Sequence, residues 1–161
     1  MKLVVGLGNP ELSYLSTRHN AGYIFIENLQ RSKLHGGVLV RKTNVFMNQS
    51  GEFVKMQVEK YQINLKDLFV VHDDLDIPLG EFKIQFGRGP KDHNGLKSID
   101  DKLGSSAYWH VRIGVDNRDP DNRTSGEEYV LQNFQDSERK ILDEVIDKAC
   151  KKLEILLANT K

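Results

Sequence analysis

The chain has 161 residues, of which 39% are hydrophobic and 29% are charged, which fits one globular domain over residues 1–161 with a sizeable core. Its 23 Lys and Arg balance its 23 Asp and Glu, so a global positive field is excluded and any nucleic acid must be bound by a local basic patch. The single cysteine, Cys150, excludes an intramolecular disulfide, and the lack of a long apolar run predicts a cytoplasmic protein with no membrane span.

Apolar runs and amphipathic stretches alternate through the first half of the chain. Residues 3–7 form a short apolar run that Gly8-Asn9-Pro10 ends, so we expect a buried strand followed by a turn. A first helix is expected from Thr17, whose hydroxyl would cap it. A second strand at residues 38–40 and a second helix from Ser50 follow.

The second half of the chain begins with the most informative strand. Residues 68–71 are apolar throughout and change abruptly to His72-Asp73-Asp74, which predicts a strand covered on both faces with a polar site at its carboxyl end. The further expected elements are a strand at residues 81–86, a Gly/Pro loop at 87–92, a helix at Asn94–Leu103, a strand at 109–115, a polar and mobile loop at 116–126, and an amphipathic helix from Ser137 with Cys150 in its core face. Short strands that alternate with helices predict an α/β sandwich.

His19 and Asp73 are the strongest candidates for catalysis. His19 lies where the first helix is expected to begin, a position at which a lone histidine is more often an ordinary exposed residue. Asp73 follows the buried strand, and if both positions meet in one cleft, its carboxylate fixes the imidazole tautomer and favours the protonated form. No Gly-x-Ser-x-Gly motif is present. Direct attack by a water that His19 activates is therefore favoured over a covalent intermediate.

Cofactor and metal sites fit the sequence poorly. Gly6-Leu7-Gly8 follows a strand, but Glu11 stands where a dinucleotide-binding loop needs its third glycine. The run His72-Asp73-Asp74-Leu75-Asp76, with His19 and His93 elsewhere, resembles a set of metal ligands, yet alternation along a strand sends His72 and Asp73 to opposite faces. We therefore expect neither a cofactor nor a metal.

Asn9, Asn48 and Asn94 each lie at the boundary of an expected element. Asparagine is common at turns and helix caps, so an ordinary structural role suits all three. Their amides would also supply neutral donors and acceptors to an ester, and donors aimed at a developing oxyanion contribute strongly to acyl transfer. Spacing alone leaves both interpretations open.

Basic residues occur in small groups, for which a solvated face is the default interpretation. The groups are Arg41 with Lys42, Arg88 with Lys91, and Lys97 with Lys102 and Arg112. Arg88 and Lys91 differ from the rest because a Gly/Pro loop presents them just before His93 and Asn94. They suit contacts with phosphates, which would position a nucleic acid without selecting its sequence.

Five ordered motifs resemble those of the bacterial-type peptidyl-tRNA hydrolases. They are residues 5–10 with Tyr14 and Thr17-Arg18-His19-Asn20-Ala21-Gly22, then Phe46-Met47-Asn48-Gln49-Ser50-Gly51, residues 72–80, residues 93–99, and Arg112-Ile113-Gly114-Val115. The motifs follow the family order at compatible spacing between residues 4 and 115, which makes the resemblance far more specific than any one motif.

The resemblance implies a fold, an activity and a set of site residues. The fold would be a single-domain three-layer sandwich with a mixed, mostly parallel central sheet, working as a monomer without cofactor, metal or obligate protein partner. The activity would be hydrolysis of the ester that joins a peptide to the terminal ribose of tRNA, recycling tRNA from stalled translation. The resemblance implies that His19 is the general base, that Asp73 holds and polarises it, and that Asn9 distinguishes blocked from free aminoacyl-tRNA. It also implies that Asn94 holds the water and that Arg112 binds tRNA phosphates. The residues implied to bind the peptide and the 3′ end are Tyr14, Phe46, Asn48 and Asn94.

This chain departs from the family pattern in two regions. The stretch over residues 20–47 is shorter than usual. In the glycine-rich loop before the second histidine motif, Arg88, Lys91 and Asp92 stand where glycines are expected, and Gln85 replaces a basic residue. We therefore expect an altered grip on tRNA, in which Arg88 and Lys91 compensate for the charge that is missing at Gln85.

Two rival functions fit parts of the sequence. A non-catalytic RNA-binding relative of the same fold would need neither His19 nor Asp73, and both are present. A hydrolase of a small ester or peptide would need no basic surface, which suits the neutral composition. Free tRNA separates these functions, because it would inhibit a tRNA enzyme competitively and leave a small-substrate enzyme unaffected.

Overall fold

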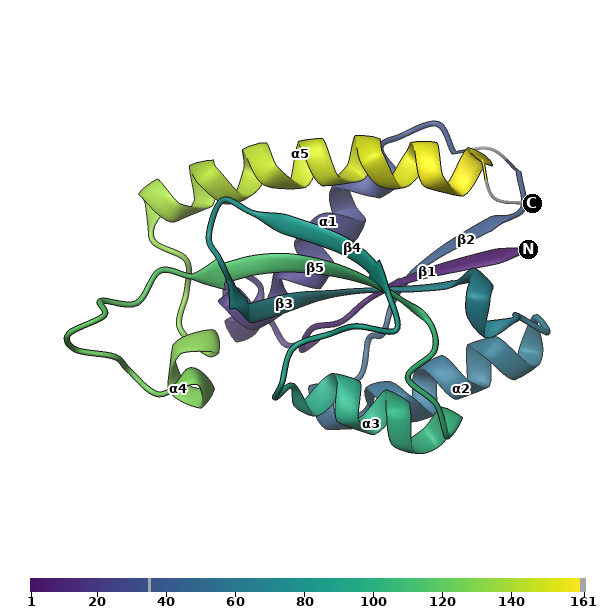
Figure 1. Ribbon diagram of the computed structural model, residues 1–161, viewed down its shortest axis with the longest axis horizontal. Coiled ribbons are helices and arrows are strands. Elements are labelled where there is room, and N and C mark those ends of the chain that lie inside the picture. The colour runs from purple at the N-terminus through teal and green to yellow at the C-terminus, as the bar shows by residue number, and fades with distance from the viewer. Residues whose placement is uncertain (35, 160–161) are drawn as a thin grey trace.

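The protein is built on a five-stranded sheet, seen in a computed structural model that describes residues 1–34 and 36–159 (Figure 1). The strand order is β2-β1-β3-β5-β4. The strands are β1 (Lys2–Gly6), β2 (Val38–Lys42), β3 (Leu68–Pro78), β4 (Phe82–Phe86) and β5 (Trp109–Asp116). All neighbouring pairs are parallel except β4 and β5, which run antiparallel. This confirms the mixed, mostly parallel sheet.

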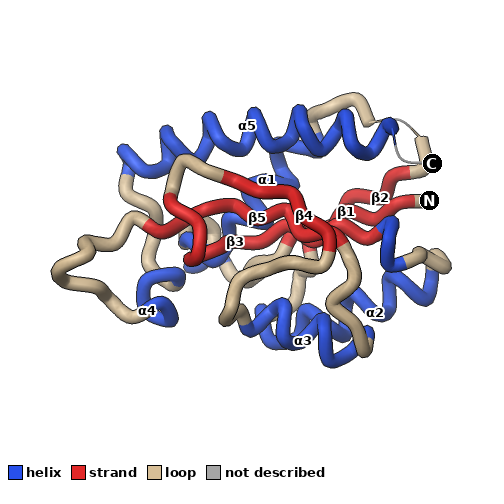
Figure 2. Tube along the Cα trace, in the orientation of Figure 1, coloured by secondary structure: helices blue, strands red, loops and turns tan. Residues whose placement is uncertain are grey.

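Helices cover both faces of this sheet. They are α1 (Ala21–Gln30), α2 (Ser50–Lys60), α3 (Asn94–Leu103), α4 (Gly126–Val130) and α5 (Asp136–Asn159), and four short 3₁₀ turns lie at Leu12–Tyr14, Arg18–Asn20, Met47–Gln49 and Leu65–Asp67. In Figures 1 and 2, α1 and α5 lie on one side of the sheet, and α2 and α3 lie on the other. The predicted three-layer α/β sandwich is therefore confirmed.

Each face of the sheet has its own hydrophobic core, and strand alternation supplies both. In β3, Phe69 and Val71 pack against α1 and α5, whereas Leu68 and Val70 pack against α2 and α3. All four side chains are fully buried, which explains why this strand is a continuous apolar run. Cys150 of α5 faces the core, as its position in the apolar stripe predicts.

Three local features differ from the sequence-based expectations. The Thr17 hydroxyl donates to the carbonyl of Tyr14 at 2.9 Å instead of capping a helix, because a 3₁₀ turn precedes α1. Strand β3 continues past its apolar run to Pro78, because its polar residues still pair with β5. Helix α4 was not expected; it has only five residues and begins beyond Ser125, whose hydroxyl accepts from the backbone of Glu128.

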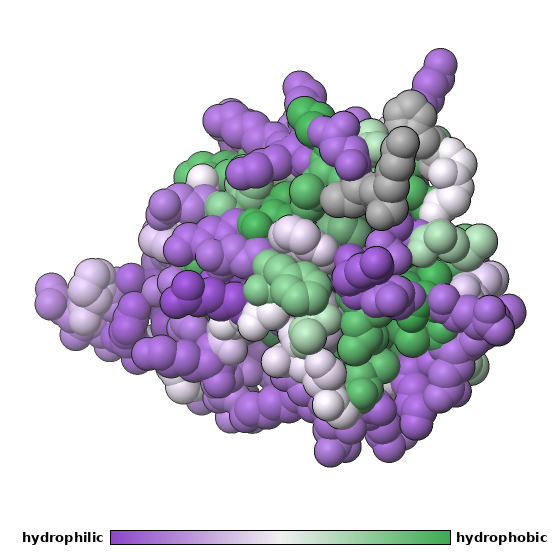
Figure 3. Space-filling model, turned by 45° about the vertical axis from the view of Figure 1, so that its right-hand side comes forward, coloured by the Kyte–Doolittle hydropathy of each residue, from purple (hydrophilic) through white to green (hydrophobic). Residues whose placement is uncertain are grey.

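Polar side chains cover most of the molecular face seen in Figure 3, with hydrophobic side chains gathered in patches among them. Within residues 1–34 and 36–159, no helix combines the length and apolar character needed to cross a membrane.

The parallel strands all present their carboxyl ends at one edge of the sheet. Figure 1 shows α4 and the beginning of α3 at this same edge. The first 3₁₀ turns follow β1 there, and the polar residues of β3 reach it from the centre of the sheet. In parallel sheets of this kind, ligands bind in the crevice outside the carboxyl ends of the strands.

Candidate active site

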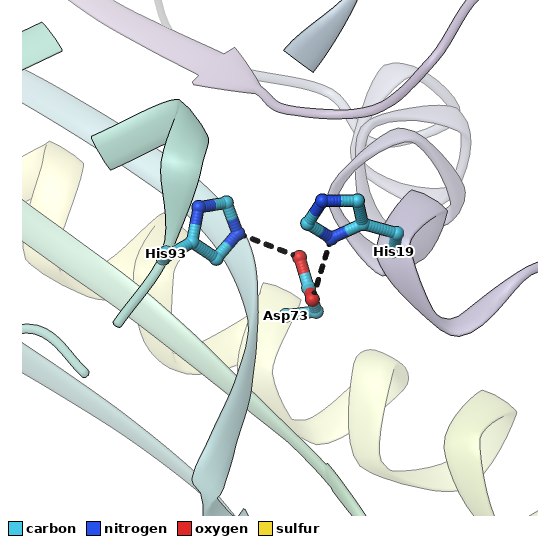
Figure 4. A group of neighbouring side chains, drawn as sticks. All are labelled: His19, Asp73 and His93. Carbon is cyan, nitrogen blue, oxygen red and sulfur yellow. Dashed lines mark hydrogen bonds and ion pairs between the residues drawn. The ribbon is translucent and has the colours of Figure 1, made fainter. Parts of the chain in front are cut away.

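Two histidines hold one buried carboxylate at this edge (Figure 4). The Nδ1 atom of His19 lies 2.8 Å from Oδ2 of Asp73, and Nε2 of His93 lies 2.8 Å from Oδ1 of the same carboxylate. Asp73 comes from β3, His19 from the turn before α1, and His93 from the position just before α3. The cleft that would join His19 to Asp73 is therefore present, and His93 completes the group.

The hydrogen bonds assign the tautomers of both rings. Nδ1 of His93 accepts from the backbone N–H of Leu96 at 3.3 Å, so the proton of the neutral ring is on Nε2, which donates to Asp73. Asp73 likewise accepts from Nδ1 of His19, which leaves Nε2 of His19 unprotonated in the neutral ring. A lone pair on Nε2 is what a general base needs.

Burial and charge act in opposite directions on these groups. Burial lowers the pKa of His19, but the charge and hydrogen bond of Asp73 outweigh it, so that the pKa lies above its ordinary value. Burial also raises the pKa of Asp73, yet the two histidines hold that pKa well below its usual range. The Asp73 carboxylate thus stays ionised and stabilises the protonated form of His19.

The same three residues are also the one group, among the residues described, whose donor atoms lie close enough to share a metal ion, within 4.8 Å of one another. Both Asp73 oxygens, however, already accept hydrogen bonds from ring nitrogens at 2.8 Å. The protons on these nitrogens occupy the positions that a metal would take. His72 faces away and bonds to His110 at 3.1 Å, as strand alternation predicts. The geometry therefore favours a hydrogen-bonded His–Asp–His cluster over a metal centre.

A cavity of about 970 Å³ opens beside these residues. Seven of the eight candidate site residues line it: Asn9, Tyr14, His19, Phe46, Asn48, Asp73 and Asn94. Part of its wall comes from α4 and from Arg118, and Lys91 and Lys97 lie on its lining as well. The size suits a small ligand or the end of a larger one.

Asn9 is held rigidly in this cavity. Its Oδ1 accepts from the backbone N–H of Met47 at 2.9 Å, which leaves the amide nitrogen as its donor. Its backbone forms two hydrogen bonds with the side chain of Asn20, at 2.8 and 2.9 Å. Asn20 is fully buried and was not singled out from the sequence. Its place one residue after His19 was the available signal.

Arg112 is the one candidate site residue that lies away from the cavity. Its side chain is 8% exposed, and its Nε donates to Asp74 at 2.7 Å while a terminal nitrogen donates to the Gln85 amide oxygen at 2.7 Å. It does not line the cavity. A buried guanidinium with these partners is not presented to a phosphate. The antiparallel pairing of β4 with β5 brings Gln85 close to it. In this structure Arg112 is bound within the fold, and its contact with a tRNA phosphate stays a prediction.

His93 and Arg118 are site residues that sequence reasoning missed. His93 was weighed only as a metal ligand, although its place directly before Asn94 marked it as part of a motif. Arg118 lies in the polar segment after β5 and lines the cavity while its Nε binds Asp116 at 2.8 Å. Nothing in the sequence indicated that this segment returns to the site.

Comparison with known proteins relates both the sequence and the fold to one family. The family model described as peptidyl-tRNA hydrolase matches residues 3–37 and 30–161. A peptidyl-tRNA hydrolase of Azoarcus sp. strain BH72 is 37% identical over 92% of this chain and 75% of its own. The crystal structure of peptidyl-tRNA hydrolase from Acinetobacter baumannii has a TM-score of 0.82 at 30% identity, covering 98% of this chain and 89% of that one. A NiFe hydrogenase maturation protease from Thermococcus kodakarensis, with a TM-score of 0.57 at 15% identity over 98% of this chain and 93% of its own, shares the fold alone.

Proposed function

The chain belongs to the peptidyl-tRNA hydrolase family, and on that premise we propose that its site hydrolyses the ester between a peptide and the 3′-terminal ribose of tRNA. The observation that carries the mechanism is the bond of 2.8 Å between His19 and Asp73, which leaves Nε2 of His19 as a base beside the cavity. No second catalytic group is needed for water to be the nucleophile.

The reaction needs one proton transfer in each direction. Nε2 of His19 takes a proton from water as the water oxygen attacks the ester carbon, and a tetrahedral oxyanion forms. The Asp73 carboxylate stabilises the resulting imidazolium, since it stays ionised. Collapse of the intermediate breaks the bond to the ribose oxygen, which receives the proton from His19. The products are a peptide with a free carboxyl group, which then loses its proton to water, and tRNA with a free terminal hydroxyl.

Asparagine side chains bind the substrate around His19 and Asp73. The free amide nitrogen of Asn9 donates to a peptide carbonyl, and an unblocked aminoacyl group has an ammonium there, which offers no acceptor. This distinguishes peptidyl-tRNA from aminoacyl-tRNA. Asn94 holds the water, and Tyr14, Phe46 and Asn48 bind the peptide and the 3′ end. All of them line the same cavity.

The proposal extends to the setting of the reaction. The substrate is peptidyl-tRNA, so the enzyme acts in translation and works in the cytoplasm, where that substrate arises. We also propose that it acts as a monomer and as one domain, which agrees with a site whose His19, Asp73 and asparagines all come from one chain.

The activity is tested by release of N-acetyl-aminoacyl groups from tRNA, with unblocked aminoacyl-tRNA as the matched substrate. We expect rapid cleavage of the blocked substrate alone and competitive inhibition by free tRNA. Tight tRNA binding without cleavage would instead indicate an RNA-binding role. Cleavage that free tRNA does not inhibit would indicate a hydrolase of small esters.

The loop before α3 is expected to supply phosphate contacts through Arg88 and Lys91, both of which are exposed. Replacing both with alanine should lower the slope of log affinity for tRNA against log salt by roughly 1.5, since each phosphate contact contributes about 0.7–0.9. Filter binding of tRNA between low and moderate salt measures this slope. Lys148→Ala with Lys151→Ala is the control, because it removes the same charge from α5, outside the cavity lining. An unchanged slope in the loop variant would refute the contacts.

A further inference from the structure

A buried ion pair involves the residue next to the proposed base in the chain. Arg18 precedes His19 in the same 3₁₀ turn, and its guanidinium donates to Glu138 at 2.7 Å. The side chains are only 4% and 3% exposed, and neither residue lines the cavity or touches Asp73. The pair joins the turn that carries His19 to the beginning of α5, 120 residues further along the chain.

Glu138 gathers four donors on its two oxygens. Oε1 accepts from Arg18 and from the backbone of Gln135 at 2.9 Å, while Oε2 accepts from the Asn117 side chain at 3.1 Å and lies 3.5 Å from the Tyr129 hydroxyl. Asn117 begins the loop after β5, and Tyr129 belongs to α4. One carboxylate thus ties together the His19 turn, this loop, α4 and α5.

The contacts of Tyr129 extend the network to the cavity wall. The Arg18 guanidinium lies 3.8 Å from the centre of the Tyr129 ring, and that of Arg118 lies 5.5 Å from it. Arg18 also donates to the Tyr129 carbonyl at 3.1 Å. The cavity that His19 lines is also lined by the residues that flank Tyr129 in the chain, Gly126, Glu127, Val130 and Leu131. Fixing Tyr129 therefore fixes this wall.

Backbone bonds attach the same turn to the segment between α4 and α5. The N–H of Arg18 donates to the carbonyl of Gln132 at 3.1 Å, and that of Phe134 donates to the carbonyl of Ser16 at 3.0 Å. Thr17 and Asn133 form an antiparallel bridge between these bonds. The position of His19 is thus set by contacts on its N-terminal side as well as by Asp73.

Stability alone does not account for this pair. A buried ion pair is often no more stabilising than apolar residues of similar volume, because desolvation offsets the attraction. Among the residues described, Nε of Arg18 is a buried donor without a hydrogen-bond partner, which adds to that cost. We propose that Arg18 and Glu138 are positioning residues, which hold His19 at hydrogen-bond distance from Asp73 and hold α4 as the cavity wall. This inference rests on the proposed role of His19 as the base.

The test compares two variants. Glu138→Gln removes the negative charge and keeps the size of the side chain, and Arg18→Lys keeps the positive charge but loses the planar guanidinium with its several N–H donors. We expect kcat on N-acetyl-aminoacyl-tRNA to fall by about ten- to hundredfold for Glu138→Gln, the cost of a small misplacement of a catalytic group, and by less for Arg18→Lys. A weaker bond to Asp73 lowers the pKa of His19, so the acid limb of the pH–rate profile moves to lower pH. Asp73 and His93, which face His19, are unchanged in these variants.

The control is Glu27→Gln on α1, which breaks an exposed ion pair with Lys42 of β2 and should change neither kcat nor the acid limb. If a single variant melts below the assay temperature, Arg18→Met with Glu138→Leu leaves no buried charge unpaired and should recover Tm without recovering kcat. A folded variant that keeps kcat and the acid limb of the wild type overturns the positioning role. Wild-type protein that does not hydrolyse N-acetyl-aminoacyl-tRNA would instead refute the proposed role of His19 as the base.

Discussion

Replacing His19 with alanine is expected to lower kcat/KM for N-acetyl-aminoacyl-tRNA by about 10²–10⁴-fold, the usual loss when a general base is removed. Nε2 of His19 is the one nitrogen of the pair of histidines that is left as a base, since Nδ1 of His93 accepts from Leu96. Single-turnover cleavage of the blocked substrate, with the mutant and wild type at equal concentration, measures this loss directly.

The fold should survive this substitution. The His19 side chain is partly exposed at the cavity, and the turn that carries it remains fixed by Arg18 and by the backbone bonds to residues 132–134. Circular dichroism and affinity for free tRNA should therefore match the wild type. His19→Ala protein that still hydrolyses the substrate at a near-normal rate would remove His19 from the mechanism, whereas loss of tRNA binding would show that the variant tests the fold instead.

The pH dependence follows from the same residue. A base acts when deprotonated, so activity rises with pH through the pKa of His19. Burial lowers that pKa and Asp73 raises it by more, so the net shift is upward and the acid limb should lie above the ordinary value of 6.5. The limb should vanish in the His19→Ala variant, whose remaining activity has no base to titrate.

The meeting of His19 and Asp73 was predictable from the sequence, because two local rules place both residues. A polar run after a buried apolar strand lies at the carboxyl edge of a parallel sheet, and the turn after β1 reaches the same edge. His19 and Asp73 meet there at 2.8 Å. The strand and helix periods likewise predicted β3 and the apolar face of α5, since both depend on burial patterns that are written locally.

The features that the sequence did not predict are long-range pairings. Arg112 looked like a surface cation, and only the register of β3, β5 and β4 shows that Asp74 and Gln85 surround it. Arg18 and Glu138 are 120 residues apart, and no local pattern distinguishes a buried pair from two solvated charges. The role of His93 depends on a tautomer, which requires the geometry of Leu96.

Asp73→Asn is expected to reduce kcat by up to about 10⁴-fold, close to the loss of the base itself, which is the effect of the same change at the orienting aspartate of a catalytic triad. An amide has one oxygen to accept and one nitrogen to donate, so it cannot accept from both histidines. The backbone of Leu96 holds His93 with its proton on Nε2, so the amide oxygen turns toward His93 and the amide nitrogen toward His19. His19 must then accept at Nδ1, which leaves its proton on Nε2, where the water should be activated.

Nitrogen-15 NMR and the comparison with Asp73→Ala separate this tautomer effect from a simple loss of charge. Nitrogen-15 NMR of His19 should show the proton on Nδ1 in the neutral wild type and on Nε2 in Asp73→Asn. The pKa of His19 should fall in the variant, because the charge and hydrogen bond that raise it are gone while burial remains, so the acid limb moves to lower pH. Asp73→Ala is the matched control, since it removes the charge but leaves the tautomer free, and it should retain more activity than Asp73→Asn. Equal activity in the two variants would mean that Asp73 acts through its charge alone.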